Sequence, residues 1–277
     1  MFEWMSTSEL ALMPVRLFLS HHFGVAMNDF RQRCVGFERV IGTFAAIPHP
    51  VAIEVAAASG LDFICIDAEH SQIGRELTEN LIRASDVHRV PAMVRVPGHA
   101  PESIAGVLDA GAAGVLVPRI STAAQAKAAV MATRYPPFGE RGVGPGRAAG
   151  YGYRIPDYLK SANESLVLAI QIETAEGLAN VEEIVAVEGT DVIFIGPGDL
   201  SVSLTAAGEG GAEKLDAAIH KITKAARAAG KAVGIFRPSP DDVGKWSDAG
   251  ISFYLLASDT MFLGASLAAG VTAARSA

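Results

Sequence analysis

Residues 167–200 read VLAIQIETAEGLANVEEIVAVEGTDVIFIGPGDL and contain the repeat from which the chain is built. The apolar run Val167–Ile172 is followed by a helical pattern over Ala175–Val187 and then by a second apolar run, Val192–Ile195. Strands that are apolar throughout are typical of parallel sheets, because helices cover both faces of such sheets. The segment therefore predicts a strand–helix–strand unit of the α/β class.

The same alternation extends in both directions from this segment, starting at Arg39. Strands are expected at Val40–Ala45, Phe63–Asp67, Ala92–Val96, Gly114–Val117, Val167–Ile172, Val192–Ile195, Ala232–Phe236 and Phe253–Ala257. Helices are expected at Pro48–Ser59, Arg75–Val87, Pro101–Ala110, Thr122–Thr133, Ala175–Val187, Ala212–Ala229, Pro240–Ala249 and Thr260–Ala274. Strict alternation predicts one (β/α)8 TIM barrel over residues 39–277, with a doubly wound open sheet as the alternative.

The composition excludes several functional classes. Half of the 277 residues are hydrophobic and 19% are charged, which indicates a large buried core and excludes a disordered chain. Lys and Arg total 23 against 30 Asp and Glu, and this acidic balance disfavours a nucleic-acid partner. No run reaches the ~20 apolar residues of a membrane span. The two cysteines form no CxxC motif or disulfide framework, which favours a cytoplasmic location.

Residues 1–38 show little strand or helix pattern, so we expect a partly disordered N-terminal extension there. Its apolar part, Leu10–Leu19, is broken by a proline and an arginine and lacks a basic leader, which argues against a signal peptide. Met27 opens a polar segment, and we hypothesise that residues 1–26 precede the natural start.

One expected connection is far longer than the others. Arg134–Ser165, between the fourth and fifth strands, is rich in Gly, Pro, Arg and Tyr. Its Gly-Val-Gly-Pro-Gly sequence neither follows a strand directly nor opens an evident helix, so it fits a dinucleotide-binding fingerprint poorly. Long loops in compact barrels are usually functional, and we expect an active-site lid, with an interface loop as the alternative.

Polar side chains gather where the expected strands end. In a (β/α)8 barrel the chemistry lies at the carboxyl ends of the strands. The polar residues at these ends are Asp67, Glu69, His70, Arg95, Arg119, Gln171, Glu173, Asp199, Arg237 and Asp259. This cluster of acids, arginines and one histidine is the main functional signal in the sequence.

Glu173 and Asp199 are candidate ligands of a hard metal ion. Burying an unpaired carboxylate at the end of an apolar strand is costly, so Glu173 needs a cation or a salt bridge to an arginine such as Arg95. Asp199 could place a second oxygen on the same ion, or could instead cap a helix that begins at Leu200. One or two carboxylates, with water and substrate oxygens, are the usual ligands of Mg²⁺.

His70 is the histidine best placed for acid–base chemistry, since an ordinary pKa near 6.5 lets it take and return a proton. Asp67 or Glu69 could orient its ring, and a solvent-facing loop histidine is the alternative. His99, shortly beyond the third strand, is a second candidate. No lysine falls at the carboxyl end of a strand, which disfavours a Schiff base, and we expect Cys65 to be a core residue.

Seven motifs carry a resemblance to a known family. In chain order they are DFICIDAEH, VRVPGH, GVLVP, RYPPFGERGVG, RIPDYL, LAIQIETAEG and VIFIGPGDLS. Their order and spacing resemble the metal-dependent pyruvate aldolases of the HpcH/HpaI type, which include 4-hydroxy-2-oxoheptanedioate and 2-dehydro-3-deoxyglucarate aldolases. The similarity extends from about Ile41 to the C-terminal helix. It implies reversible cleavage of a 4-hydroxy-2-oxo acid to pyruvate and an aldehyde, in the catabolism of aromatic compounds or sugar acids.

The resemblance also implies how the substrate is held. Glu173 and Asp199 would bind a divalent ion (Mg²⁺, Mn²⁺ or Co²⁺) that polarises the carbonyl of the 2-oxo acid. Gln171, together with the backbone around Gly198, would hold the carboxylate and carbonyl of pyruvate.

The catalytic roles and the assembly follow from the same resemblance. His70, with Asp67 beside it, would act as the base, and Arg95 would stabilise the negative charge of the metal-stabilised pyruvate enolate. Asp109 would raise the basicity of a histidine in a neighbouring subunit. A homo-oligomer is therefore implied, typically a hexamer (a dimer of trimers) with exchanged C-terminal helices.

Three positions depart from the family pattern. The acidic loop reads DAEHSQIG, Arg119 follows Pro118, and IFRPSP follows the seventh strand. These departures put the choice of aldehyde in doubt, and we hypothesise that Arg119 or Arg237 contacts an anionic or polar aldehyde. Two rival functions remain: a citrate-lyase-like enzyme acting on a CoA thioester, and a non-catalytic 2-oxo-acid-binding protein.

Overall fold

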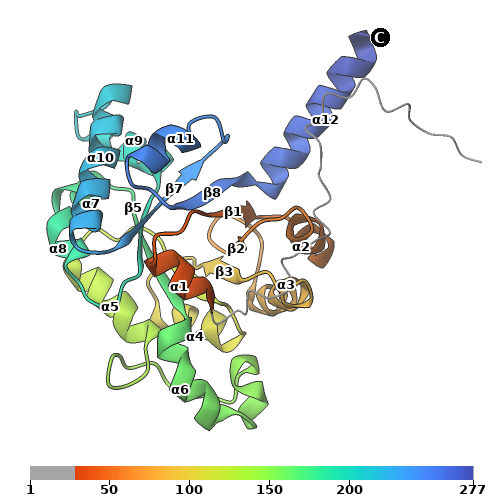
Figure 1. The fold of residues 1–277 in the computed structure, drawn as a ribbon, viewed down its shortest axis with the longest axis vertical. Helices are drawn as coiled ribbons and strands as arrows, with labels where there is room; N and C mark the ends of the chain where they lie inside the picture. The colour runs from red at the N-terminus through yellow and green to blue at the C-terminus, as the bar shows by residue number, and fades with distance from the viewer. Residues whose placement is uncertain (1–28, 277) are drawn as a thin grey trace, which may run out of the picture.

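The computed structural model describes residues 29–276. Residues 1–28, which include Met27 and most of the expected extension, lie outside the described residues, as does Ala277. Eight parallel strands close into a barrel in the order β1-β2-β3-β4-β5-β6-β7-β8, and helices surround it (Figure 1). The (β/α)8 TIM barrel is confirmed, and the doubly wound sheet is excluded.

The strands end within one residue of their predicted bounds. They are β1 (Val40–Ala45), β2 (Phe63–Asp67), β3 (Ala92–Arg95), β4 (Gly114–Val117), β5 (Val167–Ile172), β6 (Val192–Ile195), β7 (Ala232–Arg237) and β8 (Phe253–Ser258). From β2 to β6 every strand residue is buried, which explains why the strands read as continuous apolar runs.

The helices follow the prediction less closely. They are α1 (Phe30–Val35), α2 (Pro50–Ala57), α3 (Arg75–Val87), α4 (Pro101–Asp109), α5 (Ala123–Thr133), α6 (Ile155–Ser165), α7 (Ala175–Ala179), α8 (Val181–Val185), α9 (Pro197–Ala206), α10 (Ala212–Ala228), α11 (Val243–Asp248) and α12 (Asp259–Ser276). A 3-10 helix, η2, covers Arg147–Gly152. The single helix expected over Ala175–Val187 is two short helices that meet at Asn180. The helices α1 and α6 were not predicted, and α9 begins three residues before the helix that was considered only as an alternative, from Leu200 onward.

Buried hydrophobic side chains form two clusters: one fills the barrel interior, and the other lies between the sheet and the helices. The aromatic members of the interior cluster include Phe63 and Phe253, whose ring centroids are 4.4 Å apart. Cys65 belongs to this cluster, and burial raises the pKa of its thiol far above the usual value. Cys65 is therefore a core residue, as predicted.

Helix α1 closes the amino-terminal end of the barrel. The ring of Phe30 lies 5.3 Å from that of Phe63, the first residue of β2. Arg31 donates to Asp191 Oδ1 at 2.7 Å, just before β6 begins. Residues 30–35 were expected to lie in an extension, but the structure shows them packed against the barrel.

The long connection also lies at this end. Helix α5 returns from the carboxyl end of β4 to the amino-terminal end of the barrel, and the connection follows it. Arg134 is buried and donates to Leu166 O at 2.8 Å and to Asp191 Oδ2 at 2.7 Å, which fastens both ends of the segment near the starts of β5 and β6. The prediction of a lid over this chain's own barrel mouth is therefore wrong, because the loop follows a helix and not a strand.

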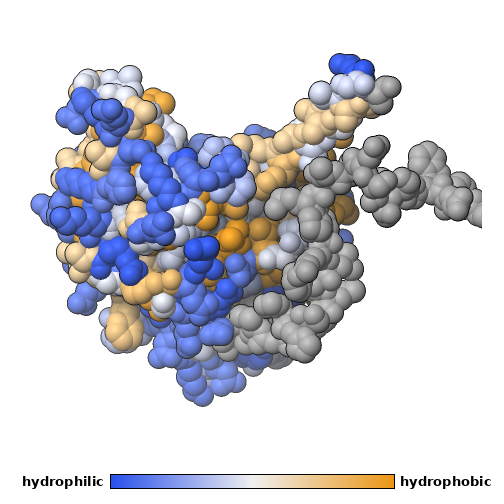
Figure 2. Space-filling view, turned by 45° about the horizontal axis from the view of Figure 1, so that its top comes forward, coloured by the Kyte–Doolittle hydropathy of each residue, from blue (hydrophilic) through white to orange (hydrophobic). Residues whose placement is uncertain are grey.

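Helix α12 projects away from the barrel (Figure 1), and none of its described residues is buried. Its exposed apolar side chains include Phe262, Leu263, Leu267 and Val271. Figure 2 shows them as a pale to orange stretch along the projecting helix. Despite this apolar surface, none of the described helices combines the length and apolarity needed to cross a membrane.

Candidate active site

A buried ion pair joins the ends of β2 and β3. Asp67 and Arg95 stand opposite each other in the register of the two strands. Arg95 Nε lies 3.0 Å from Asp67 Oδ1, and Arg95 Nη2 lies 2.6 Å from Asp67 Oδ2, so the pair is bidentate. The guanidinium also stacks 4.2 Å from the ring centroid of Phe44. Burial alone lowers the pKa of Arg95, but the hydrogen bonds and charge of Asp67 outweigh that effect and raise it.

The loop after β2 carries Glu69 and His70 over this pair. The backbone N–H groups of both residues donate to Asp67 Oδ1 at 3.1 Å. Glu69 Oε2 lies 3.4 Å from Arg95 Nε and 3.7 Å from His70 Nε2. Burial raises the pKa of Glu69, although Arg95 and His70 oppose the shift. Of the two predicted partners for the histidine ring, the structure thus places Glu69 beside it, while the carboxylate of Asp67 fixes Arg95 and the loop backbone.

Glu173 follows β5 and is buried without a Lys or Arg partner among the described residues. Its Oε1 accepts the backbone N–H of Arg119 at 2.8 Å, and its Oε2 accepts a hydrogen bond from Gln171 Nε2. No Lys or Arg of residues 29–276 forms an ion pair with it, so the alternative of a salt bridge to Arg95 is wrong. Burial raises the pKa of Glu173 to about 7, and the negative charges of Asp199 and Glu69 add to the shift.

Helix α9 begins directly after β6 and brings Asp199 to the same end of the barrel as Glu173. Gly196 is the N-cap and Asp199 lies in the first turn, so the alternative reading of Asp199 as the helix cap is wrong. A Cβ on Gly196 would lie 2.6 Å from Gln171 Nε2 and 2.7 Å from Glu173 Oε2, so a larger residue there would displace both of these side chains. Around Gly198 the space is open, since a Cβ there would meet no atom within 4 Å.

These residues fit a divalent cation. Within the part of the chain that the structure describes, the buried Gln171 Oε1 has no hydrogen-bond partner and the neighbouring carboxylate of Glu173 pairs with no Lys or Arg. Such groups need a partner that supplies positive charge. Within residues 29–276, no three His, Cys, Asp or Glu side chains are grouped as metal ligands. The protein would therefore supply the two carboxylates, and water and substrate oxygens would complete the coordination, as is usual for Mg²⁺.

The other polar side chains at strand ends are largely engaged. Arg237 Nε donates to Asp242 Oδ1 at 3.0 Å, and its Nη2 donates to the other carboxylate oxygen. His99 Nε2 lies 2.7 Å from Pro118 O, so this ring is held by backbone. Arg119 is exposed, has a φ of 54° and forms no ion pair within the described chain.

Asp109 lies at the opposite end of the barrel. It is the last residue of α4, the helix that returns to the amino-terminal end, and its Oδ1 accepts from Arg141 Nη2 at 2.6 Å. In a single chain it therefore cannot reach His70, and a catalytic role would require a second subunit.

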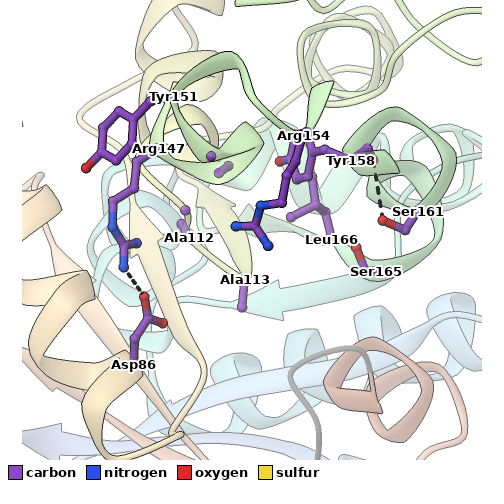
Figure 3. A pocket seen from close by; sticks show the side chains of 13 residues that line it. Asp86, Ala112, Ala113, Arg147, Tyr151, Arg154, Tyr158, Ser161, Ser165 and Leu166 are labelled. Atoms are coloured by element: carbon purple, nitrogen blue, oxygen red, sulfur yellow. Dashed lines mark hydrogen bonds and ion pairs between the residues drawn. The ribbon is translucent and has the colours of Figure 1, made fainter. Parts of the chain in front are cut away.

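A cavity of about 510 Å³ also lies at this end (Figure 3). The Asp86–Arg147 ion pair stands on one side of it, and Arg154 and Tyr158 come from the other. It contains none of the predicted site residues. The residues expected from the sequence to carry the chemistry, Asp109 apart, therefore lie at the barrel mouth, and none of them lines this cavity.

Two features of the mouth were missed by sequence reasoning. Gly196 was not identified as the residue that makes room for Gln171 and Glu173, although the Gly-Pro-Gly sequence after a strand is a signal for such a site. The backbone N–H of Arg119 as a partner of Glu173 left no sequence signal, because any residue except proline supplies that donor.

The chain is similar to known proteins over most of its length. A model of the HpcH/HpaI aldolase/citrate lyase family matches residues 40–265. The 2-keto-3-deoxy-L-rhamnonate aldolase of Escherichia coli K12 is 39% identical over 237 residues, which cover 84% of this chain and 88% of that protein. The hydroxypyruvate/pyruvate aldolase of Delftia acidovorans is 36% identical over 238 residues, covering 85% and 88%. A crystal structure of a family protein from Burkholderia cenocepacia J2315 is similar with a TM-score of 0.83 and 34% identity, covering 90% of this chain and 99% of that one.

Proposed function

The chain belongs to the HpcH/HpaI aldolase/citrate lyase family, and we propose that it is a metal-dependent aldolase acting on 4-hydroxy-2-oxo acids. It would cleave them reversibly to pyruvate and an aldehyde. The observation that carries this proposal is the buried Glu173 carboxylate, which pairs with no Lys or Arg of residues 29–276 and lies beside Gln171 Oε1, which has no hydrogen-bond partner there. An aldolase that works through a lysine imine would need a lysine at the barrel mouth instead.

Glu173 and Asp199 would hold the divalent ion. When bound, that ion acts as a Lewis acid on the keto oxygen of the substrate. Gln171 would orient the 2-oxo acid through its buried amide. The backbone N–H groups that open α9, around Gly198, favour an anion and would bind the carboxylate of pyruvate.

His70 would remove the proton from the 4-hydroxyl group. As that proton leaves, the C4–O bond becomes a carbonyl, the C3–C4 bond breaks, and its electron pair stays on the pyruvate part as an enolate. The ring of His70 is 61% exposed in its side chain, so the proton can pass to solvent, and Glu69 stabilises the charged ring. In the reverse direction, the enolate adds to the aldehyde.

Arg95 would stabilise the enolate. Its guanidinium is held by the two carboxylate oxygens of Asp67 on one edge and by the ring of Phe44 on one face, so it needs no reorganisation as charge develops. The role of Asp67 is then to fix the direction of Arg95.

The assembly is proposed on the basis of α12. A helix that buries none of its side chains in its own chain, yet exposes Phe262 and Leu267, is suited to pack on a second copy. We expect a homohexamer with exchanged C-terminal helices, in which Asp109 reaches the site of another subunit. The two buried free thiols suit a reducing compartment such as the cytoplasm.

A retro-aldol assay tests the function. Purified protein and a 4-hydroxy-2-oxo acid are incubated, and pyruvate is detected with lactate dehydrogenase, before and after EDTA and after added Mg²⁺, Mn²⁺ or Co²⁺. We expect pyruvate to form, chelation to abolish the activity and a divalent ion to restore it. Activity that survives chelation, or a lysine adduct trapped by borohydride, would contradict the mechanism. Cleavage of a CoA thioester without any pyruvate formation would favour the citrate-lyase-like alternative.

A further inference from the structure

We propose that Arg119 selects the aldehyde by binding an anionic group, a carboxylate or a phosphate, at its far end. This inference rests on the proposed aldolase function, because it assigns the second substrate of the same site. The sequence left the role open between Arg119 and Arg237. Four observations at the barrel mouth favour Arg119.

The first observation is the position of Arg119. It lies two residues beyond β4, between the strand that ends at Arg95 and the strand that leads to Glu173. Its backbone N–H donates to Glu173 Oε1 at 2.8 Å, so the start of its side chain lies next to the predicted metal ligand. The side chain is exposed, and it can therefore reach a substrate that extends outward from the metal.

The second observation is that no carboxylate of the described residues pairs with the guanidinium of Arg119. Arg237 is paired with Asp242 through two hydrogen bonds, and Arg95, paired with Asp67 in the same way, is already assigned to the enolate. In the described part of the chain, no carboxylate lies within 4 Å of the Arg119 guanidinium. An anionic substrate group can bind it without displacing a protein carboxylate, and Arg suits the bidentate geometry of carboxylate and phosphate.

The third observation is that the fold does not require arginine at this position. The φ of 54° is a left-handed conformation, which favours glycine or asparagine over a long side chain. The hydrogen bond to Glu173 comes from the backbone and needs no particular side chain. A long cationic residue in an unfavourable conformation at a functional site indicates a role for its side chain.

The fourth observation concerns the other anion in the reaction. The carboxylate of pyruvate has a separate candidate site in the N–H groups that open α9, where the space around Gly198 is free. Arg119 is thus left for the second substrate.

Two pairs of aldehydes test the inference, each with the same number of carbon atoms but differing in charge. Succinic semialdehyde is compared with butanal, and glyceraldehyde 3-phosphate with glyceraldehyde, in condensation with pyruvate and Mg²⁺. A charge-assisted hydrogen-bond pair changes affinity by about 10- to 100-fold. We expect kcat/KM of the wild-type protein to favour the charged member of at least one pair by about that factor, and the preferred pair identifies the carboxylate or the phosphate. In Arg119→Met the preference should disappear, and in Arg119→Lys it should fall only in part.

Arg237→Met is the matched control and should keep the wild-type preference. Arg119→Gly, which suits the positive φ, provides a second variant if Arg119→Met folds poorly, as judged by its thermal midpoint. Equal preference in the wild-type and Arg119→Met proteins would overturn the inference, as would a loss of preference in Arg237→Met alone. A rise in the KM for pyruvate, with equal losses for charged and neutral aldehydes, would also overturn it, because Arg119 would then bind pyruvate.

Exchange of the pyruvate methyl protons with D₂O, followed by NMR, separates this inference from the proposed function. The exchange needs enolate formation but no aldehyde. Its absence in the wild-type protein with Mg²⁺ would refute the aldolase proposal itself. Metal-dependent exchange without a preference for charged aldehydes would refute only the role of Arg119.

Discussion

Replacing Glu173 by glutamine should stabilise the metal-free protein and abolish its response to divalent ions. Glutamine keeps the size of the side chain and can still accept the backbone N–H of Arg119 through its amide oxygen. The amide of Gln171 can turn over so that its unpartnered Oε1 faces the new NH₂ group. The substitution therefore removes a buried charge without opening a cavity.

The magnitude follows from the pKa of Glu173, which burial raises from 4.5 to about 7. Each pKa unit corresponds to about 1.4 kcal/mol, so the charged carboxylate costs the folded protein on the order of 3 kcal/mol above pH 7. The folded state holds this proton up to about pH 7, whereas the unfolded chain releases it near 4.5. The wild-type protein therefore loses stability as pH rises between these values, and the variant does not. At pH 5.5 the gain of the variant should be less than half of its value at pH 8.

Thermal unfolding in EDTA at pH 5.5 and pH 8 measures the effect. For a domain of this size, 3 kcal/mol corresponds to roughly 6–12 °C in the midpoint. The matched control is Asp199→Asn, at the other predicted ligand, which is exposed. It should give a smaller gain than Glu173→Gln, because it removes only a neighbouring charge that adds to the pKa shift of Glu173. In the wild-type protein, Mg²⁺ at a hundred times its Kd should raise the free energy of unfolding by about 2.7 kcal/mol and thereby raise the midpoint. Neither variant should respond. A midpoint of Glu173→Gln at or below that of the wild type in EDTA at pH 8 would refute the reasoning.

Three further predictions concern the base, the buried ion pair and the projecting helix. His70→Gln should lower the rate of aldol cleavage by about 10²- to 10⁴-fold and change the free energy of unfolding by less than about 0.5 kcal/mol, because its side chain is 61% exposed; an unchanged rate would exclude it as the base. Arg95→Met should cost about 3–5 kcal/mol in urea unfolding, because Asp67 keeps a buried charge without its ion-pair partner. Adding Asp67→Leu should restore only part of that stability, because the backbone N–H groups of Glu69 and His70 lose their acceptor, and it should not restore activity; recovery of activity in the double variant would contradict the role of Arg95. Leu267→Ser with Val271→Ser on α12 should reduce the assembly seen by light scattering, with Val55→Ser on the exposed face of α2 as the control, and an unchanged particle mass would exclude α12 from the interface.

The strands could be predicted almost to the residue because burial on both faces leaves continuous apolar runs such as Val167–Ile172. Helix α6 was missed, and α9 was considered only as an alternative that begins at Leu200, because their first residues are ambiguous. Helix α6 begins at Ile155 inside a segment rich in glycine and proline, and α9 begins with Pro-Gly-Asp, a sequence that is equally typical of a turn. Local sequence does not contain the tertiary contacts that settle these cases.

For the candidate site, too, some features could be predicted from the sequence and others could not. Parallel strands bring their carboxyl ends together whatever the loops do, so the grouping of Glu173, Arg95 and His70 at one end could be predicted. The pairing within the group could not be predicted, because Asp67 was considered as a partner of His70 and Glu173 as a partner of Arg95. The interstrand register, which sets Asp67 opposite Arg95, decides between them. The place of the long connection was predicted wrongly, because its length was considered without the direction of the helix before it.

The pairing of β5 with β6 has a consequence for engineering. Ile172 stands opposite Ile195 in the ladder, and Glu173 and the start of α9 follow directly from that pair. The spacing between Glu173 and Asp199 is therefore inherited from rigid backbone. Loops elsewhere on the rim, such as the one after β7, could be diversified in a library without moving the two proposed metal ligands. The barrel would then serve as a rigid scaffold, and variants that form carbon–carbon bonds with new aldehydes could be selected on it.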